Sequence, residues 1–175
     1  MTAQCPSVET SGPEPLSSDA FRSVFRRHPS GVAVVALTDD GGPVGFTATS
    51  VISVSADPPI LAFSVAASSS SRPALSRARS LTVSFLAADQ VDVSARFATS
   101  GIDRFAGVAW SQLPTGEPVL SDVPSWVRGE IIEQTPVGSS FLVSVLVLES
   151  HQGEPVPPLV YHDRSYHRVD DDSAL

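Results

Sequence analysis

The sequence contains no lysine, and this absence excludes several classes of enzyme. All eleven basic residues are arginine, so the chain cannot supply a P-loop lysine, a Schiff-base lysine or a Ser-x-x-Lys pair. Cysteine is almost as scarce, because Cys5 is the only one, and this excludes a disulfide framework or a cysteine-based zinc site. A single cysteine is compatible with the reducing cytosol, so we expect a cytoplasmic protein.

Long apolar runs and an excess of positive charge are missing as well. No stretch of about 18 apolar residues occurs, which argues against a transmembrane helix. The net charge is -8, from 19 acidic and 11 basic residues, and this balance disfavours nucleic acid or an anionic membrane as the main partner. We therefore expect a soluble protein.

Three common catalytic signatures are also absent. The sequence has no Gly-x-Gly-x-x-Gly, Gly-x-Ser-x-Gly or His-Glu-x-x-His, the patterns of dinucleotide binding, esterases and zinc proteases. Of the four histidines, His162 and His167 lie in a strand-like segment at a spacing that would point them to opposite faces. We therefore expect no metal site.

The length of 175 residues and a hydrophobic content of 42% support one domain. Residues 1–18 are rich in proline and serine and lack hydrophobic periodicity, so a disordered N-terminal tail is expected there. The domain is expected over residues 19–170. Residues 171–175 are expected to form a short acidic C-terminal tail.

Apolar periodicity predicts a mainly β domain with a few short helices. Phe21, Val24 and Phe25 share one face of a helix that begins at Asp19 and ends before Pro29. Two more helices are predicted at residues 74–78 and 90–100, and strands at residues 31–37, 44–55, 60–65, 81–86, 126–134, 141–149 and from 159 onward. About seven strands without regular βαβ alternation favour a closed or half-closed antiparallel barrel.

Two clusters of hydroxyl side chains are the first candidates for a binding site. Thr47-Ala48-Thr49-Ser50 lies within a predicted strand, and Ser68-Ser69-Ser70-Ser71-Arg72 follows another at a predicted helix start. Hydroxyls, backbone N–H groups and an arginine that converge could hold a phosphate without lysine. Alternatively, threonine is simply common in strands and serine-rich turns are solvated loops.

Basic and aromatic residues form two further candidate groups. Arg96-Phe97 and Arg104-Phe105 flank a short loop and could edge a planar ligand, or both phenylalanines could be ordinary core residues. The segment at residues 161–167 gathers histidine, tyrosine and arginine, although a strand with one wet face would look the same. Its Arg164 could bind a phosphate or carboxylate, or pair with a nearby acid in solvent.

Short motifs in a fixed order carry a resemblance to a known family. They are Phe21-Arg22-x-x-Phe25, His28-Pro29-Ser30-Gly31-Val32, Gly45-Phe46-Thr47-Ala48-Thr49-Ser50, Ser53-Val54-Ser55-x-x-Pro58-Pro59, Ser94-Ala95-Arg96-Phe97-Ala98, Asp103-Arg104-Phe105-Ala106-Gly107, Gly116-x-Pro118-Val119-Leu120 and Pro158-Leu159-Val160-Tyr161-His162-x-Arg164-x-Tyr166. The ordered set resembles the short-chain flavin reductases over residues 19–169. It looks closest to the FMN reductases that serve desulfurisation and similar aromatic monooxygenases.

The resemblance implies a split β-barrel that binds FMN, or FAD, near the interface of a homodimer. It implies an NAD(P)H:flavin oxidoreductase that reduces the flavin by hydride transfer and supplies it to a partner flavin-dependent monooxygenase. NADH or NADPH would be the hydride donor. So acidic a chain has few arginines for a 2′-phosphate, which slightly favours NADH.

The resemblance also implies which residues bind the cofactors, and none of them is a catalytic acid or base. The residues implied for the flavin are Thr47, Ala48, Thr49, Ser50, Ser68, Ser69, Ser70, Ser71, Arg96, Phe97 and Phe105. The residues implied for the nicotinamide side are Ser140, His162, Arg164 and Tyr166.

One departure from the family pattern concerns the nicotinamide side. The family commonly has Gly-Asp-His before a strand, whereas this chain has Gly138-Ser139-Ser140. A hydroxyl can hydrogen-bond but can neither carry charge nor stack as an imidazole does. An alternative is therefore a flavin-binding protein of this fold without nicotinamide-dependent reductase activity. A non-flavin interaction domain is a third reading.

Overall fold

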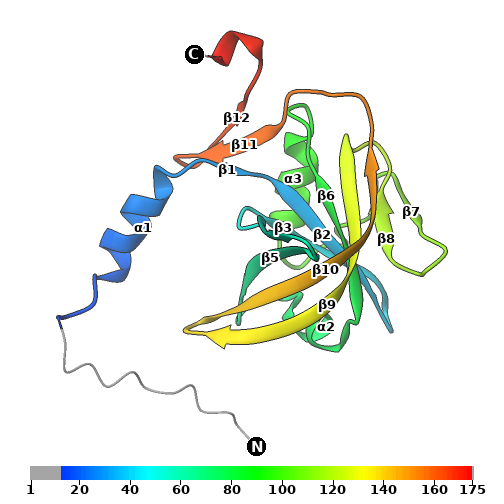
Figure 1. Cartoon of the computed structure of the whole chain (residues 1–175), viewed down its shortest axis with the longest axis horizontal. Helices are drawn as coiled ribbons and strands as arrows, with labels where there is room; N and C mark the ends of the chain where they lie inside the picture. The colour runs from blue at the N-terminus through cyan, green and yellow to red at the C-terminus, as the bar shows by residue number, and fades with distance from the viewer. Residues whose placement is uncertain (1–12, 175) are drawn as a thin grey trace, which may run out of the picture.

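The computed structural model describes residues 13–174, so most of the expected N-terminal tail, with Cys5, lies outside the described residues. The molecule is built around one seven-stranded antiparallel sheet that curls into an open barrel (Figure 1). The strand order is β3-β2-β6-β9-β10-β5-β4, so β3 and β4 are the edges. The bounds are β2 Ala33–Asp39, β3 Gly42–Ala48, β4 Ile52–Ala56, β5 Pro59–Ala66, β6 Ser80–Phe85, β9 Ser125–Val137 and β10 Ser140–Gln152. The predicted mainly β architecture is confirmed.

Smaller elements surround this sheet. Three strands form a second sheet in the order β1-β11-β12, and β7 pairs with β8. Their bounds are β1 Ser30–Gly31, β11 Leu159–His162, β12 Ser165–Arg168, β7 Trp110–Gln112 and β8 Pro118–Leu120. The helices are α1 Ser18–Arg26, α2 Arg72–Arg77, α3 Val91–Ala98 and the 3-10 turn η1 Asp171–Ser173.

Two of the predicted strands are each divided in the structure. The predicted strand at residues 31–37 becomes β1 and β2, and that at 44–55 becomes β3 and β4. The second break occurs because Ser50 bonds to the backbone of β5: its Oγ donates to the Ser64 carbonyl at 3.1 Å and accepts from the Ser64 N–H at 2.9 Å. The chain therefore stops pairing with β2 at the end of β3 and pairs with β5 as β4.

The central strand β2 is buried on both faces. Val35 and Leu37 pack with Phe63 inside the barrel, whereas Val34 and Ala36 pack outside it against α3 and β11. Strand residues alternate between faces, so one continuous apolar run can serve two core clusters. This arrangement fixes α3 and the β11–β12 hairpin against the outer face of the barrel.

Gly45 allows α3 to approach β3 closely. A Cβ atom at this position would lie 2.6 Å from Cε1 of Phe97 and 3.2 Å from Cζ of Phe105. We expect Gly45→Ala to lower the free energy of unfolding by about 1–3 kcal/mol through overpacking. Urea unfolding measures this, with Gly31→Ala as the matched control because its Cβ would meet nothing within 4 Å. An equally stable Gly45→Ala would show that the two rings can shift.

A buried ion pair joins Glu117, which immediately precedes β8, to Arg128 on β9. Glu117 is 3% exposed, and Nη2 of Arg128 lies 2.9 Å from its Oε1. Burial alone would raise the pKa of Glu117, but hydrogen bonds from Arg128, Ser80 and Thr115 outweigh this and lower it to about 2. The carboxylate is therefore ionised and fully partnered in the folded protein.

Helix α1 projects away from the barrel and has no buried residue (Figure 1). Its apolar side chains Phe21, Val24 and Phe25 are 53%, 64% and 56% exposed. The helix is held near β11 and β12 at its C-terminal end, where the Asp163 N–H donates to the Arg26 carbonyl at 2.9 Å. Packing in the barrel core therefore does not account for this helix.

Candidate functional site

Arg104 and two serines of the predicted phosphate cluster meet next to β3. Nη1 of Arg104 donates to Oγ of Ser71 at 2.9 Å and to the carbonyl oxygen of Gly45 at 2.8 Å. Nη2 donates to Oγ of Ser70 at 3.3 Å, and Nε donates to the Thr99 carbonyl at 2.7 Å. Arginine and hydroxyls thus converge as the sequence suggested, but through an arginine 33 positions away from Ser71.

Within the described part of the chain, the Arg104 guanidinium has no carboxylate partner. None of the ion pairs formed within residues 13–174 involves it, and burial lowers its pKa. A partly desolvated cation that meets only neutral acceptors gains stability from an anion. Ser70 is exposed and accepts from Arg104, so its hydroxyl hydrogen remains available to donate, whereas Ser71 is 1% exposed and serves to position the guanidinium. This set of donors fits a phosphate group.

Arg72 does not contribute to this cluster, which corrects the interpretation from sequence. Its guanidinium lies over the ring of Phe141, 3.8 Å from the centroid, on strand β10. The other serines of the turn differ in role: Ser69 Oγ accepts from the Ser71 N–H at 3.3 Å, and Ser68 is exposed. The turn therefore brings Ser70 and Ser71, rather than all four serines, to Arg104.

Hydrogen bonds through Ser94 connect a residue predicted for the flavin, Thr47, with one predicted for the nicotinamide side, Tyr166. Oγ1 of Thr47 donates to the carbonyl oxygen of Ser94 on α3 at 2.6 Å. The Ser94 hydroxyl, which is fully buried, shares a 2.9 Å hydrogen bond with the Tyr166 hydroxyl on β12. Ser94 belongs to the Ser94-Ala95-Arg96 motif but was not predicted as a site residue. The structure thus joins β3, α3 and β12 at one place.

The four residues from Thr47 to Ser50 have different environments. Ala48 packs in the barrel core at 5% exposure, and both hydrogen-bonding capacities of the Ser50 hydroxyl are used by the backbone of Ser64. Thr49 is exposed and forms no hydrogen bond within residues 13–174. Thr49 therefore has the hydroxyl most available to a ligand in this segment.

Thr49 lines a small hollow that also contains Arg164. We call this the α1 hollow; its volume is about 280 Å³, and its lining residues are Arg22, Phe25, Arg26, His28, Ser30, Thr49, Tyr161 and Arg164. Two predicted residues from the two cofactor sides, Thr49 and Arg164, thus share one hollow. Helix α1 contributes three of the side chains that line this hollow. The sequence analysis had not assigned these three residues to any site.

His162 and His167 lie on the same side of the β11–β12 hairpin, contrary to the expected opposite faces. Their ring centroids are 5.6 Å apart. The spacing argument assumed one strand, whereas the chain reverses at Asp163 and Arg164 and pairs Val160 with His167. No group of three or more potential metal ligands occurs among the residues that the structure describes.

Arg96 braces a loop next to α3. Its Nε donates to the Arg104 carbonyl at 3.1 Å and its Nη2 to the Asp103 carbonyl at 3.0 Å. The rings of Phe97 and Phe105 pack edge to face with centroids 5.0 Å apart, and they are 0% and 6% exposed. Arg96, Phe97 and Phe105 therefore pack against the segment that carries Arg104 and support its position.

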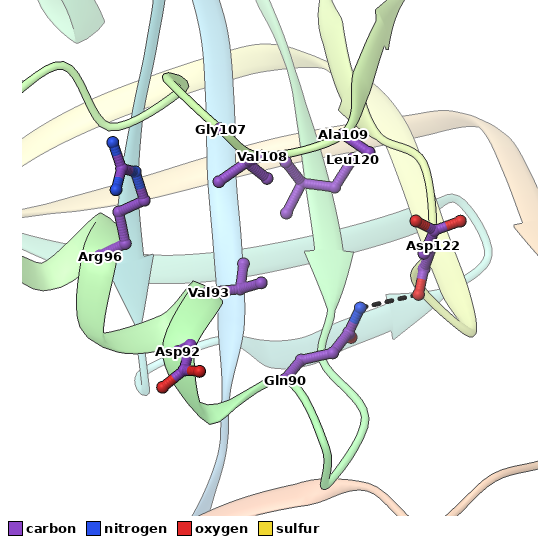
Figure 2. A pocket seen from close by; sticks show the side chains of 9 residues that line it. All are labelled: Gln90, Asp92, Val93, Arg96, Gly107, Val108, Ala109, Leu120 and Asp122. Atoms are coloured by element: carbon purple, nitrogen blue, oxygen red, sulfur yellow. Dashed lines mark hydrogen bonds between the residues drawn. The ribbon is translucent and has the colours of Figure 1, made fainter.

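A second hollow, of about 450 Å³, lies between α3 and the segment at residues 107–109 (Figure 2). Arg96 is its only predicted site residue, and its other polar side chains include Asp92, Gln90 and Asp122. Gln90 is already engaged, because its Nε2 donates to the Asp122 carbonyl at 2.7 Å. Two carboxylates on the rim make this hollow unsuited to a phosphate.

Ser140 lies apart from the other predicted nicotinamide-side residues. It begins β10 opposite Ala66 of β5, and Figure 1 shows the β9–β10 turn well separated from β11 and β12. The backbone next to it contacts the start of the serine turn, where the Ala67 N–H donates to the Ser139 carbonyl at 2.9 Å. Within one chain, therefore, Ser140 neighbours the phosphate cluster and not His162, Arg164 or Tyr166.

Comparison with known proteins decides the family. The model of the flavin reductase like domain matches residues 25–170. The chain belongs to this family. An NADH:FMN oxidoreductase from Rhodococcus erythropolis is 46% identical over 153 residues, which cover 85% of this chain and 80% of that protein. The reductase subunit of a flavin-dependent monooxygenase from Rhodococcus jostii is 27% identical over 162 residues, covering 93% and 83%.

A solved structure confirms the fold of this flavin reductase like protein. The crystal structure of a flavin reductase domain protein from Arthrobacter sp. FB24 superposes with a TM-score of 0.84 at 38% identity. The match covers 88% of this chain and 96% of that one. None of the helices within residues 13–174 is long and apolar enough to cross a membrane.

Proposed function

We propose that this protein is an NAD(P)H:flavin oxidoreductase that reduces FMN with NADH and supplies reduced flavin to a partner monooxygenase. FAD and NADPH are the alternative flavin and donor. The similar proteins that are named for NADH, FMN and flavin-dependent monooxygenases support this proposal. The observation that carries it is the cluster of Arg104, Ser70 and Ser71, in which a partly buried cation meets two serine hydroxyls and no counter-charge from residues 13–174.

The protein's part in the reaction is to bind and orient, because a bound flavin itself supplies the hydride-accepting ring. Arg104 and Ser70 hold the phosphate, and the buried Ser71 positions Arg104. From Gly45, next to Arg104, to Thr49 the chain runs four residues, roughly 13 Å at the rise of a strand. This span is long enough for the ribityl chain together with the near part of the flavin ring system, and it ends at the α1 hollow, where Arg164 faces the donor.

The direct test follows the absorbance of NADH, and separately of NADPH, with added FMN, FAD or riboflavin under air. Turnover that saturates with free flavin is expected. If flavin binds but neither donor is oxidised, the reductase proposal is overturned in favour of a flavin-binding protein whose Ser139 and Ser140 replace the usual Asp-His. If no flavin quenches the tryptophan fluorescence, the protein is an interaction domain.

Delivery to a separate monooxygenase requires that the flavin leave. A product that diffuses away cannot be held at picomolar strength, so we expect micromolar affinity and full loss of flavin on gel filtration. Flavin that stays at full occupancy after purification would contradict delivery. We also propose that delivery takes place in the cytoplasm, since the single cysteine needs no oxidising compartment.

Thr49→Val tests the flavin side of the α1 hollow. Both residues are β-branched, so the backbone is expected to be unchanged, while FMN binding weakens by about 1 kcal/mol for one lost hydrogen bond. Fluorescence titration with FMN measures this, together with the thermal midpoint as a check on folding. Equal affinity of the variant would remove Thr49 from the flavin site.

We further propose that the protein is a homodimer. Edge strand β4 exposes Ile52 and Val54, and β10, which lies on the other side of β5, exposes Leu142 and Leu148, each between 44% and 58%. Adjacent exposed apolar residues on a sheet are typical of an interface. Light scattering should give twice the chain mass of 18.3 kDa, and Ile52→Asp should shift it toward the monomer. A monomer at micromolar concentration would contradict this proposal.

A further inference from the structure

The serine turn, residues 67–71, is attached at both ends to the β9–β10 hairpin. At its start, the Ala67 N–H donates to the Ser139 carbonyl at 2.9 Å. At its end, where α2 begins, the Arg72 guanidinium lies over the ring of Phe141, 3.8 Å from the centroid. The two hairpin residues are only two positions apart, so one short piece of the hairpin contacts both ends of the turn.

The start of α2 has no side-chain cap of its own. Ser71 occupies the cap position but makes no capping hydrogen bond, and its Oγ instead accepts from Nη1 of Arg104 at 2.9 Å. A capping hydroxyl normally accepts from a backbone N–H of the first turn and so stabilises the helix start. A helix of six residues is also too short to be stable by itself. The position of the serine turn therefore depends on contacts with the rest of the fold.

The Arg72 guanidinium has a reason to stay on the hairpin. Its Nε and Nη1 are buried and form no hydrogen bond within residues 13–174, and no ion pair in that range involves it. Burial of a cation is costly unless an attraction offsets it. The face of the Phe141 ring supplies one, and a cation–π contact is strongest when it is desolvated. This contact holds the first residue of α2 against β10.

The same hairpin also holds α2 further along the helix. Nε2 of Gln134 on β9 donates to the Leu75 carbonyl at 2.9 Å, and the Leu75 side chain is fully buried in the barrel core. Figure 1 shows α2 beside β9. Three contacts from one hairpin thus fix the serine turn and the helix that follows it.

The serine turn must be placed accurately to meet Arg104. The Arg104 guanidinium is held independently by two backbone carbonyls, so it cannot follow a turn that moves. Its Nη2 lies 3.3 Å from Oγ of Ser70, at the long end of the hydrogen-bond range, where a small shift breaks the contact. Ser70 lies two residues before Arg72, so a change at the Phe141 contact displaces it.

We propose that the end of the β9–β10 hairpin positions the serine turn for the flavin phosphate, with Arg72 and Phe141 as the positioning residues. This inference rests on the proposed function. Arg72 acts through the serines that it follows, because its own guanidinium points to the hairpin. The contact from Ser139 uses its backbone carbonyl, so Arg72 and Phe141 are the side chains that an experiment can change.

Fluorescence titration of the flavin-free protein with FMN and with riboflavin tests this role. Arg72→Gln and Phe141→Leu should each weaken FMN binding about 5-fold, the effect of one lost cation–π contact. Riboflavin binding should be unchanged, because riboflavin has no phosphate. Arg77→Gln is the matched control, since Arg77 lies on the same helix but is 57% exposed and pairs with Asp39. A wild-type ratio of FMN to riboflavin affinity in both variants overturns the proposal.

Combining the two changes distinguishes one shared contact from two separate packing effects. The double variant should bind FMN as weakly as either single variant, about 5-fold and not about 25-fold below the wild type, because the same contact is lost. Arg72→Lys and Phe141→Trp each keep a cation over an aromatic face and should keep most of the FMN affinity. Losses that multiply in the double variant, or a full loss in Phe141→Trp, would show that the cation–π contact does not position the turn.

Steady-state kinetics separate this inference from the proposed reductase activity. In Arg72→Gln the KM for FMN should rise about 5-fold, with kcat and the KM for NADH nearly unchanged. An equal rise in both KM values would indicate general loss of structure and overturn the positioning role. A wild type that oxidises neither donor would refute the reductase activity alone, because the FMN to riboflavin ratio is measured without turnover. A wild type that binds both flavins equally would refute the phosphate site at Arg104 and this inference together.

Discussion

Replacing Arg104 with glutamine will weaken FMN binding by about 10- to 100-fold and leave riboflavin binding nearly unchanged. The expected loss comes from the charge-assisted hydrogen bonds between the guanidinium and the phosphate, which riboflavin lacks. The effect is large because Arg104 is partly buried and has no carboxylate partner among the residues that the structure describes, so its charge is poorly screened by water. Fluorescence titrations with FMN and riboflavin measure both affinities.

Comparing the two flavins distinguishes a lost phosphate contact from misfolding of the variant. Arg104 also donates hydrogen bonds to the Gly45 and Thr99 carbonyls, so the variant can lose stability. Misfolding, however, would weaken the binding of FMN and of riboflavin equally. Arg77→Gln is the control of equal charge, because Arg77 is 57% exposed and pairs with Asp39 at the surface. An unchanged ratio of FMN to riboflavin affinity in Arg104→Gln would place the phosphate elsewhere.

Replacing Glu117 with glutamine will lower the free energy of unfolding at neutral pH by about 3 kcal/mol. The change leaves Arg128, whose side chain is only 13% exposed, without its counter-charge. The fall of the Glu117 pKa from 4.5 to about 2 gives a similar size, roughly 3 kcal/mol at 1.36 kcal/mol for each unit. Urea unfolding measures the loss, and Asp39→Asn at the exposed Arg77 pair should change stability far less.

The contribution of Glu117 depends on pH in a defined direction. Because its pKa is lower in the folded than in the unfolded chain, the contribution is complete above pH 4.5 and is lost as the pH falls toward about 2. The stability difference between the wild type and Glu117→Gln should therefore be constant near neutral pH and shrink below pH 4.5. A stability difference that stays the same at acid pH would mean that side-chain packing, and not the ionisation of Glu117, matters at this position.

Several features could be predicted from sequence because they depend on neighbours along the chain. The amphipathic helix followed from the spacing of Phe21, Val24 and Phe25, and α1 confirms it. The mainly β architecture followed from short apolar runs between turn residues, and the order of motifs identified the family. Local periodicity and turn chemistry carry this information without knowledge of what packs where.

The arginine of the phosphate cluster could not be predicted from neighbours. Arg72 adjoins the serines in sequence, yet the first turn of α2 directs its guanidinium onto Phe141. Arg104 reaches Ser71 because α3 packs on β3 at Gly45, a contact between segments far apart in the chain. The same limit applied to His162 and His167, whose faces are set by a hairpin turn and not by counting along one strand.

The sequence by itself determined the fold class, the family and the kinds of side chain available for an anion: arginine and hydroxyls, because lysine is absent. Only the tertiary structure decided which of them converge. It directed Thr47 to Ser94 and Ser50 to the backbone of Ser64, and it set α1 beside Arg164. It also left the Thr49 hydroxyl without a hydrogen bond from any other residue in the described part of the chain. The physical reason is that hydrogen bonds and burial depend on distances across the fold, whereas sequence patterns record only positions along the chain.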